Sequence, residues 1–583
     1  MGSDGKWQEI KCEVLVIGSE AAGAKAAIEA KEEGADVLVV TKGLVGKGGD
    51  TIVAGGGVQA PLGHMDPRDT PGVFFEDVVK GGAYLNNQKL VERLTSLSVT
   101  EVPKMEKWGA KFVKRGDKFE QIQYPGSSYP RGLLVVGFHG GLQWRKAFHG
   151  EFRRLNIKRM EDTFITTLLL SPDGGVAGAF GISLRKGQYV VIRSKQIILA
   201  TGGCPQIYRK TDSSLDATGD GMMIAYGAGA ALMDMEFQQF FPFCCYTPPF
   251  EMSIFPTSLH YNLRGKFYNS LGEAFMERYV PSGKDWGLRD PVSRAIYLEN
   301  KYGRGSPHGG AYLSFRHLPE NLIDHFIERA KPSYMSKLEK MGIDIRRHAL
   351  EVGPAAHYSM GGIRVNENCE TAVARLYAAG EVASGPDGAE RIDGGPAITW
   401  CLTMGYIAGK EAARKAKESD WPDMDVSQVK AEQEMVDSLW KRKEGVKGFE
   451  IKYMIKDMMW EHCALVRNRQ GLEEGVRFIE KMKRDDLPRL CVPGPSRIFN
   501  KGWVEALEAR NMVHLSEMIL RAALMREESR GAHHRTDFPQ PDNRKWFKNI
   551  VIKKGSGGMI LAPFPPVVTR IRPPKSEKGG ESI

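Results

Sequence analysis

The sequence has few cysteines, and none of them form a cluster motif. Eight cysteines are spread over 583 residues, and no two have the CxxC or CxxxxC spacing that iron–sulfur and zinc sites use. Cys244 and Cys245 are adjacent, which is poor geometry for a disulfide. We therefore predict buried free thiols in a reducing compartment, with neither a metal site nor an iron–sulfur cluster in this chain.

Long hydrophobic runs and clustered positive charge are also lacking. No apolar run approaches the roughly 20 residues that span a bilayer, and the N-terminal MGSDGKWQE contains no hydrophobic signal region. The net charge is +10, but the basic residues are dispersed and form no stripe interleaved with aromatics. These absences predict a cytoplasmic protein that neither inserts into a membrane nor binds nucleic acid. The positive charge suits an anionic substrate or an acidic partner.

A strand, turn, helix and strand open the chain. Glu13 to Ile17 is an apolar, β-branched run typical of a buried parallel strand, and a small-residue turn follows from Gly18 to Gly23. A helical pattern then runs from Ala24 to Glu33, and a second buried strand from Asp36 to Val40. Such a unit can bind the diphosphate of a dinucleotide at its helix N-terminus, which we favour over an ordinary α/β unit.

The turn departs from the GxGxxG pattern at its second glycine, where Glu20 stands. That glycine normally lets the backbone approach the phosphates. We expect the Glu20 carboxylate either to point away from the diphosphate or to tolerate its repulsion. A loop with seven glycines among fifteen residues, Gly43 to Gly57, follows the second strand and suits close approach to a large cofactor.

The rest of the chain divides by composition and periodicity. We predict a helical stretch from Asp66 to Trp108, strands over 152–203, and a helix from Met222 to Met233. An aromatic cluster begins at Phe237, and the Rossmann-like pattern resumes at Gly361. Amphipathic helices are predicted over 428–440, 449–466, 471–484 and 503–526.

These patterns predict an α/β protein of five segments. A Rossmann-like domain over 1–236 and 354–415 is interrupted by an inserted α+β capping domain over 237–353. A C-terminal helical domain covers 416–530, and a basic strand-and-loop segment covers 531–583.

Eight motifs occur in the order of one protein family. They are VIGSEAAG, which ends at Gly23, then ATGG (200–203), TGDG (218–221), GEAFMERY (272–279), LRDPVSR (288–294), HYSMGG (357–362), YAAGE (377–381) and SRGAHHRTDF (529–538). Over nearly its whole length the chain resembles the flavoprotein subunits of the fumarate reductase, succinate dehydrogenase and aspartate oxidase superfamily. The alpha subunit of adenylylsulfate reductase is a further relative.

The resemblance implies an FAD site along the turn, the glycine-rich loop and later strand ends. The implied FAD contacts are Gly18, Ser19, Glu20, Ala21, Ala22, Gly23, Thr41, Lys42, Gly49, Asp50, Thr51, Ala54, Gly56, Gly57, Thr201, Gly202, Asp220 and Glu381. In succinate dehydrogenases and many fumarate reductases, a histidine bonds covalently to the flavin; here that position is Asp50. We therefore expect non-covalent FAD, with a lower potential that favours reduction of the substrate.

The reaction implied by the resemblance is hydride transfer from flavin N5, with a proton delivered by an arginine that corresponds to Arg289. Guanidinium is a weak acid, so this role requires desolvation and a relay that reprotonates it. The family relay uses the Glu of TExxRG; here Tyr261 replaces Glu, His260 replaces Thr, and Arg264 is retained. The alternative is that Arg289 is only an ion-pair partner of Asp290.

Two clamps bind dicarboxylates in the family. His357 matches the His of the family motif HYxMGG, and Arg391, in AERIDGG, matches the Arg of the family motif NRLG; these two form the first clamp. Phe241 and Phe243 replace the His and Thr of the second clamp, QFHPT. An aromatic wall cannot pair with a second carboxylate, and burying that charge unpaired is costly. We therefore expect a substrate with one anionic head and an apolar far end, rather than fumarate.

The predicted function is an FAD-dependent oxidoreductase that reduces an activated C=C bond in an acid or acyl derivative other than fumarate. Because the chain has no cluster motif, we expect an iron–sulfur partner subunit to supply the electrons. Two alternatives stay open: an adenylylsulfate-reductase-like alpha subunit, and a non-catalytic flavin electron-transfer subunit of a redox complex.

Overall fold

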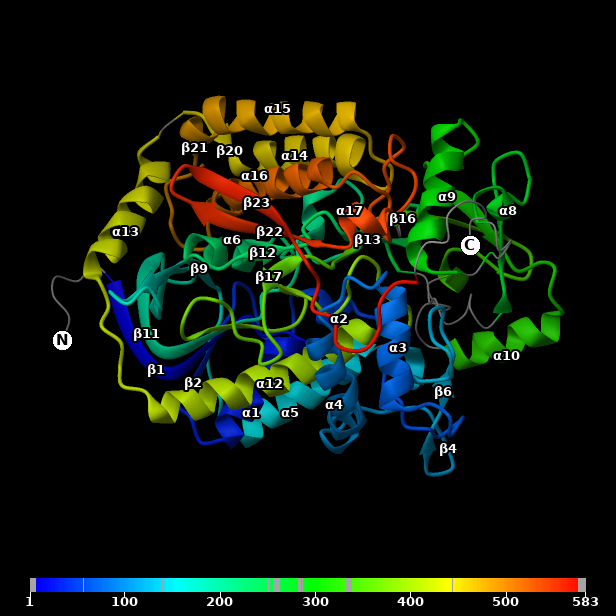
Figure 1. Cartoon of the computed structure of the whole chain (residues 1–583), viewed down its shortest axis with the longest axis horizontal. Coiled ribbons are helices and arrows are strands. Elements are labelled where there is room, and N and C mark those ends of the chain that lie inside the picture. Colours follow the sequence, from blue (N-terminus) through cyan, green and yellow to red (C-terminus); the bar gives the residue numbers. More distant parts are fainter. Residues whose placement is uncertain are drawn as a thin grey trace.

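The structure is a computed structural model. It describes residues 7–574 except 56, 139, 249–251, 255–262, 281–284, 286, 331–337 and 443. Three predicted site residues, Gly56, His260 and Tyr261, lie outside the described residues. Figure 1 shows the C-terminal helical segment above the N-terminal sheet and the inserted segment (green) to one side.

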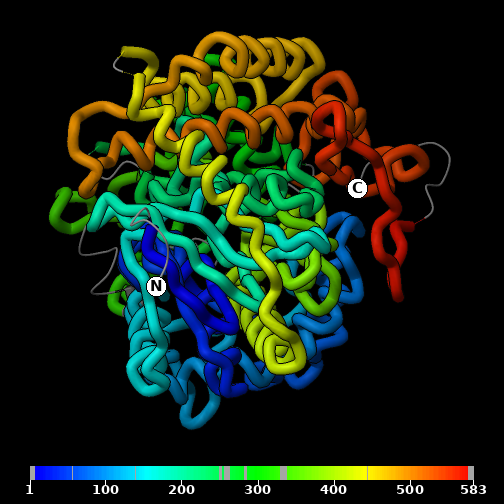
Figure 2. The backbone as a smooth tube through the Cα atoms, turned by 90° about the vertical axis from the view of Figure 1, so that its left-hand side faces the viewer, coloured from blue at the N-terminus to red at the C-terminus, as the bar shows by residue number. Residues whose placement is uncertain are grey.

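A seven-stranded sheet carries the Gly18–Gly23 turn at the end of its first strand. Its parallel strands are β8 (Lys158–Met160), β2 (Val37–Val40), β1 (Trp7–Ile17), β11 (Gln188–Leu199) and β18 (Leu376–Ala378). Two antiparallel strands, β10 (Val176–Ser183) and β9 (Thr163–Leu170), continue the sheet beyond β11. Figure 2 shows β1 and β11 side by side near the N-terminus. The strands predicted over 152–203 are confirmed.

Helices cover this sheet and place the turn. Helices α1 (Ala21–Glu32) and α12 (Pro396–Glu418) pack on each other and on β1 and β11, and α5 (Gly140–Arg154) lies beside α1. Helix α1 begins three residues earlier than predicted: Glu20 is the last extended residue, and the helix starts at Ala21.

The continuous helical stretch predicted from Asp66 to Trp108 is wrong. The structure has two helices, α3 (Pro71–Gly81) and α4 (Gln88–Lys107). The chain turns between them through Ala83 and Tyr84, which both have positive φ, and the Asn87 side chain accepts a hydrogen bond from Leu90 N to start α4.

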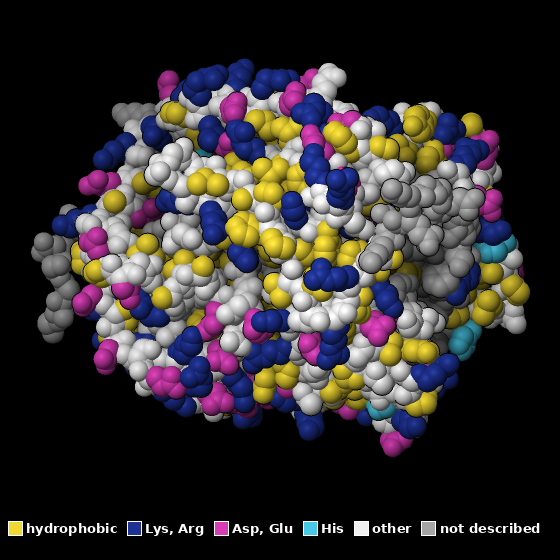
Figure 3. Space-filling model, in the orientation of Figure 1, with side chains coloured by type: hydrophobic (Ala, Val, Ile, Leu, Met, Phe, Trp, Pro, Cys, Tyr) yellow, Lys and Arg dark blue, Asp and Glu magenta, His cyan; other side chains and the backbone are white. Residues whose placement is uncertain are grey.

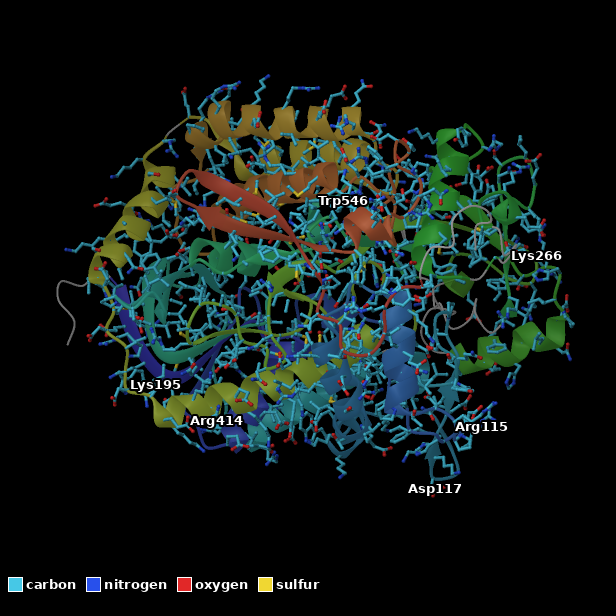
Figure 4. All side chains as sticks on the ribbon, viewed as in Figure 1. Arg115, Asp117, Lys195, Lys266, Arg414 and Trp546 are labelled. Atoms are coloured by element: carbon cyan, nitrogen blue, oxygen red, sulfur yellow. The ribbon has the colours of Figure 1, made fainter. Side chains whose placement is uncertain are left out.

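The inserted segment forms a second sheet. Its antiparallel strands are β13 (Gln238–Cys245), β16 (Leu350–Ser359), β15 (Ala311–Ser314) and β14 (Lys266–Tyr268), accompanied by helices α8 (Met276–Tyr279), α9 (Arg289–Lys301) and α10 (Glu320–Ala330). Figure 4 shows Lys266 of β14 at the outer side of this segment. The boundary predicted at residue 353 falls inside β16, so this strand continues into the part of the chain that carries His357.

A third sheet joins the C-terminal segment to the middle of the chain. Its strands are β19 (Ala383–Ser384), β17 (Gly362–Arg364), β12 (Leu232–Met233), β22 (Asn549–Gly555) and β23 (Gly558–Phe564), with the short helix α17 (Asn543–Trp546) before β22. The helix predicted from Met222 to Met233 is wrong: α6 (Asp220–Gly227) ends early, Gly229 has a φ of +98°, and β12 pairs with β22.

The helical segment follows the prediction. Its helices are α13 (Val426–Lys441), α14 (Gly448–Cys463), α15 (Arg469–Asp485) and α16 (Lys501–Met525). The shorter elements are α2 (Asp50–Val53), β3 (Gly57–Gln59), β4 (Lys114–Arg115), β5 (Lys118–Phe119), β6 (Gln121–Ile122), β7 (Gly132–Leu134), β20 (Val446–Lys447), β21 (Leu490–Cys491), and 3-10 turns at Val136–Phe138, Pro205–Ile207 and Leu487–Arg489.

The surface and the thiols agree with the composition. All eight cysteines are free, and seven of them are buried. Figure 3 shows Lys and Arg interspersed with Asp and Glu over the visible face, with Lys and Arg gathered along the top edge at α15. Among the described residues, no helix is both long and apolar enough to cross a membrane.

Candidate functional site

One cavity of about 680 Å³ joins the turn after β1 to the inserted segment. One end is lined by Gly18, by the loop before and within α2, and by the end of β11; we call it the flavin end, after the predicted cofactor residues. The other end is lined by Phe241, Arg289, His357 and Arg391; we call it the substrate end, after the predicted substrate residues. The cavity therefore brings the predicted cofactor residues and the predicted substrate residues to the same space.

The turn after β1 is shaped by close backbone approach. Gly18 has a φ of +107°, and a Cβ atom there would lie 2.1 Å from the Ala200 carbonyl oxygen. A Cβ atom on Gly23 would lie 2.1 Å from the Gly18 carbonyl oxygen. Only glycine fits either position, so the end of β1, the start of α1 and the end of β11 form one tight cradle.

Glu20 turns toward the glycine-rich loop. Its Oε2 accepts a hydrogen bond from Thr51 N at 3.1 Å, while Thr51 Oγ1 accepts one from Ala21 N at 3.1 Å. Gly49 has a φ of +76°, and a Cβ atom there would meet Glu20 Cγ at 2.4 Å. Glu20 therefore holds the loop against the start of α1, which accounts for a glutamate where the nucleotide motif has glycine.

Three carboxyl groups line the flavin end of the cavity with raised pKa values. Burial raises the pKa of Glu20 to about 8 and that of Asp50 to about 7, and it raises the pKa of Glu381 well above its ordinary value. Asp50 Oδ1 accepts from Ser214 N at 2.6 Å, and Glu381 Oε1 accepts from Ser359 N at 2.8 Å. Near neutral pH these groups tend to hold a proton, which reduces their repulsion of a diphosphate.

Lys42 is already paired within the protein. Its Nζ lies 3.1 Å from Asp220 Oδ2 and 2.7 Å from Glu508 Oε1 of α16. Asn511 Nδ2 also donates to Asp220 Oδ1 at 2.8 Å. Burial alone would raise the pKa of Asp220, but Lys42 and these hydrogen bonds outweigh it and hold that pKa below its ordinary value. The helical segment thus completes this corner of the cavity.

Most of the predicted cofactor residues line the cavity. Those that do are Gly18, Glu20, Ala22, Thr41, Lys42, Gly49, Asp50, Thr51, Ala54, Gly57, Thr201, Gly202, Asp220 and Glu381. Ser19 and Ala21 instead face a separate small cavity against α5, and Gly23 packs on Gly18. The buried Thr201 hydroxyl has no hydrogen-bond partner among the described residues, as expected of a group that awaits a ligand. This set of residues fits FAD.

At the other end of the cavity, one amide joins two arginines. Gln239 Oε1 accepts from Arg289 Nη1 at 3.1 Å and from Arg391 Nη2 at 2.8 Å, and all three side chains are buried. The Arg391 guanidinium also lies 3.9 Å from the centre of the Tyr358 ring. Burial, and then the charge of Arg289, lower the pKa of Arg391. Two cations held this close form a strong site for an anion.

Arg289 forms its ion pair with Asp393. The Arg289 Nε and Asp393 Oδ1 atoms are in contact, and the Asp393 side chain is fully buried. The alternative that named Asp290 as the ion-pair partner of Arg289 is therefore wrong, because the partner is Asp393. The Arg289 guanidinium lies 5.0 Å from the centre of the Phe241 ring, so an aromatic face covers it.

His357 is oriented by a buried carboxylate. Its Nδ1 lies 2.8 Å from Asp212 Oδ2, and its ring centre lies 5.1 Å from that of Phe241. Burial lowers the pKa of His357 and outweighs the opposing effect of Asp212. Phe243 packs behind Phe241 at 5.5 Å between ring centres and does not line the cavity. Of the two phenylalanines, Phe241 is therefore the one that lines the cavity.

Arg264 does not reach this site. Its side chain is exposed, its φ is +58°, and it does not line the cavity. The structure therefore places Arg264, which is retained from the family relay, outside this cavity.

The sequence analysis missed three residues that organise the substrate end. Gln239 stood out only as part of QFFPF, and Asp212 has no motif. Asp393 carried a visible signal, because it stands where the resembled motif NRLG has its glycine, two residues after Arg391. Replacement of that glycine by aspartate changes the charge two residues from Arg391, and this change can be read from the sequence alone.

Comparison with known proteins identifies the family. Residues 13–396 match the FAD binding domain family, and residues 452–578 match the fumarate reductase flavoprotein C-terminal family. The chain is 37% identical over 545 residues to a fumarate reductase (CoM/CoB) subunit of Methanothermobacter marburgensis, covering 93% of this chain and 97% of that one. It is 31% identical to a fumarate reductase flavoprotein subunit of Mycobacterium tuberculosis, covering 96% and 98%.

Solved structures agree with this assignment. Mycobacterium smegmatis Sdh1 in complex with UQ1 superposes with a TM-score of 0.85 at 33% identity, covering 97% of this chain and 96% of that one. A variant of E. coli quinol fumarate reductase FrdA gives 0.89 at 26%, covering 99% and 100%. Adenylylsulfate reductase from Archaeoglobus fulgidus shares the fold, with a TM-score of 0.81 at 19% identity, covering 98% and 100%.

The predicted fold class, with its FAD-binding α/β domain and C-terminal helical domain, is confirmed. The chain belongs to the fumarate reductase and succinate dehydrogenase flavoprotein family and is an FAD-dependent oxidoreductase.

Proposed function

We propose that this enzyme reduces an activated C=C bond in an organic acid or acyl derivative other than fumarate. The observation that carries the proposal is the pair of buried arginines, Arg289 and Arg391, that Gln239 joins. Both arginines line the same end of the cavity as the Phe241 ring. The arginines suit one anionic group, whereas Phe241 offers no partner to a second one.

In this proposal the cavity residues named above would hold FAD without a covalent bond, and FAD would supply the hydride when bound. Asp50 stands at the position of the family's flavin-linked histidine. Acid precipitation of the FAD-loaded protein is expected to leave the flavin in the supernatant, and a yellow pellet would contradict non-covalent binding.

Arg391 binds the substrate's anionic head in this proposal. Its guanidinium is fixed on one side by Gln239 and stacked on Tyr358, so its remaining N–H groups have a defined direction. An entering carboxylate relieves the repulsion between Arg391 and Arg289, which is a strong driving force in a buried site.

His357 changes protonation as the anion enters. With its lowered pKa it is neutral in the empty site, and donation of Nδ1–H to Asp212 then leaves Nε2 as an acceptor. A nearby anion raises the pKa of His357 and favours the doubly protonated ring, which can donate from Nε2. Substrate binding is therefore coupled to proton uptake at His357.

Arg289 delivers the proton that completes the reduction. It is nine-tenths buried, Phe241 covers one face, and Asp393 and Gln239 fix its orientation. We propose that one N–H of Arg289 protonates the carbon next to the activating group after the other carbon receives the hydride.

Electrons reach the flavin from an iron–sulfur partner protein in this proposal, and the complex acts in the cytoplasm. The described residues contain no group of His, Cys, Asp and Glu that could hold a metal ion, and the sequence has no cluster motif. The Methanothermobacter relative is named as one subunit of its enzyme, which supports a multisubunit assembly.

The test is anaerobic reoxidation of the dithionite-reduced protein. Crotonate, cinnamate, crotonyl thioesters, adenylylsulfate and fumarate are mixed with it, and the flavin absorbance is followed. We expect the mono-anionic enoates or enoyl thioesters to reoxidise it fastest. Fumarate is the second candidate, because the 37% identical relative is named a fumarate reductase, and fastest reoxidation by fumarate would overturn the proposed substrate class. Reoxidation by none would favour the electron-transfer alternative.

A further inference from the structure

Asp393 brings a carboxylate to the substrate end, directly against one of its two arginines. Its side chain is fully buried and contacts Arg289 Nε in an ion pair. The Asp393 backbone is fixed on both sides, since its N–H donates to Pro125 O at 3.1 Å and its carbonyl accepts from Gln59 Nε2 at 2.5 Å. The fold therefore holds this carboxylate beside Arg289.

A second basic group at this end also has a carboxylate partner. His357 Nδ1 lies 2.8 Å from Asp212 Oδ2, and the Asp212 side chain is buried. When His357 is protonated, the two side chains carry no net charge together. The same holds for Arg289 beside Asp393.

Arg391 differs from both of these groups, because its close contacts are neutral. Gln239 Oε1 accepts from Arg391 Nε at 3.2 Å and from Nη2 at 2.8 Å, and the centre of the Tyr358 ring lies 3.9 Å from the guanidinium. Within the described part of the chain, the ion pairs of this end join Arg289 to Asp393 and His357 to Asp212, and neither includes Arg391.

Two further carboxyl groups act on Arg391 only from a longer distance. Asp387 does not line the cavity and accepts from Trp400 Nε1 at 2.8 Å. Glu381 accepts from Ser359 N, and burial raises its pKa well above the ordinary value. Neither group forms a contact that neutralises Arg391.

The basic groups that line the substrate end and their ion-pair partners thus carry one net positive charge when His357 is protonated, and this charge lies on Arg391. One anionic head neutralises it. A dianion leaves a negative charge without a counter-charge, which is costly because Arg289, Arg391 and Asp393 are all buried. Without the Asp393 carboxylate, the same groups would carry two positive charges.

We propose that Asp393 is a specificity-determining residue: by neutralising Arg289, it restricts the site to substrates with a single negative charge. This inference rests on the proposed function, since it defines the charge of that substrate. It assigns Asp393 and Phe241 different effects. The Phe241 ring offers no hydrogen bond to a second carboxylate, whereas Asp393 removes the positive charge that a second carboxylate needs.

The test is equilibrium binding of two matched ligands to the oxidised, FAD-loaded protein. Malonate and its monomethyl ester have nearly the same shape, but at about pH 8 malonate carries two charges and the ester carries one. Neither has two adjacent saturated carbons that could be converted into a C=C bond. Titration calorimetry gives the Kd of each ligand, and the ratio of the two Kd values measures the charge preference.

The wild type should bind the monoester more tightly than malonate. Asp393→Asn removes the charge but keeps the size of the side chain, so binding of malonate relative to the monoester should strengthen about tenfold or more. Asp393→Glu keeps the charge and should keep the wild-type preference. Asp69→Asn is the matched control and should keep it too, because Asp69 is a buried carboxylate 2.8 Å from Arg131 that does not line the cavity.

A double variant keeps the test decisive if loss of one member of the buried ion pair prevents folding. Arg289→Gln combined with Asp393→Asn replaces the ion pair by two neutral side chains, so the net charge of the site does not change. The double variant should therefore still prefer the monoester. Arg289→Gln alone leaves the Asp393 charge unpaired and should weaken binding of both ligands about tenfold or more.

Three results would overturn the inference: tighter binding of malonate than of the monoester by the wild type, an unchanged preference in folded Asp393→Asn, or a preference for malonate in the double variant. The proposed function is tested separately, because these ligands do not react. If the monoester is preferred as expected but no enoate reoxidises the reduced flavin, the proposed reaction fails and the role of Asp393 in charge selection stands.

Discussion

The two ends of the cavity are built in different ways. At the flavin end, glycines and backbone form the surface, Lys42 is already paired with Asp220 and Glu508, and Glu20 and Asp50 have raised pKa values. At the substrate end, unlike-charged side chains from distant parts of the chain meet under an aromatic ring. We attribute the difference to the proposed ligands, since backbone N–H groups at a helix N-terminus can hold the diphosphate of FAD, whereas a small anionic substrate needs cationic side chains.

The contrast also explains where strain and burial are tolerated. Gly18 and Gly49 adopt positive φ so that strands and loop come close, which a small residue permits at little cost. The substrate end instead buries Arg289, Arg391 and Asp393, and desolvation of unlike charges is tolerable only because each has a partner. Four substitutions test this contrast.

Arg289→Ala should have the largest effect. We expect reduction of the enoate to fall by about 10²–10⁴-fold, because the proton donor is lost, while FAD remains bound. Stopped-flow reoxidation and the flavin-to-protein absorbance ratio measure the two quantities. Activity close to that of the wild type would remove Arg289 from the reaction and leave it as a structural partner of Asp393.

Phe241→His restores a polar group to the apolar wall. A hydrogen bond to a charged group contributes about 1.5–3 kcal/mol, so reoxidation by fumarate should rise about 10–100-fold relative to that by crotonate. The ratio of kcat/KM for the two compounds measures this change. An unchanged ratio would mean that Phe241 does not decide between one and two carboxylates.

Glu20→Gln should change stability in a pH-dependent way. The folded-state pKa of Glu20, about 8, lies above its ordinary value of 4.5, so the unfolded chain releases the proton first as the pH rises. Wild-type stability without FAD therefore falls between these two pH values. We expect Glu20→Gln to be equal to the wild type near pH 4.5 and more stable by about 1–3 kcal/mol above about pH 8, after discounting for water in the cavity.

Thermal unfolding of the FAD-free proteins at about pH 5 and about pH 8.5 checks this difference. Asp36→Asn, at a surface carboxylate paired with Lys158, is the control for a simple loss of charge. A stability difference between Glu20→Gln and the wild type that does not vary with pH would contradict a protonated Glu20.

Arg264→Ala should have the smallest effect. Its side chain is exposed and lies outside the cavity, so we expect the enoate rate to change by no more than about twofold. Steady-state kinetics check this. A loss of about 100-fold or more would place Arg264 in the proton path.

Local patterns in the sequence were sufficient for the first unit and the helical segment. Buried strands, small-residue turns and 3.6-residue periodicity report on neighbouring residues, so β1, β2 and α13 to α16 were predicted correctly. The order of motifs was sufficient for the family. The break between α3 and α4 was missed, since Ala83 and Tyr84 adopt positive φ without being glycine. The end of α6 was missed because pairing with β22 overrides local helical preference.

The sequence by itself determined the cofactor, the family and the identity of the candidate catalytic residues, because these depend on short motifs. Only the tertiary structure decided which charges meet. Arg289 pairs with Asp393 rather than with its neighbour Asp290, Gln239 joins two arginines from different segments, and Glu20 turns to Thr51. Each of these choices depends on burial and on partners far away in the chain, and no local pattern contains that information.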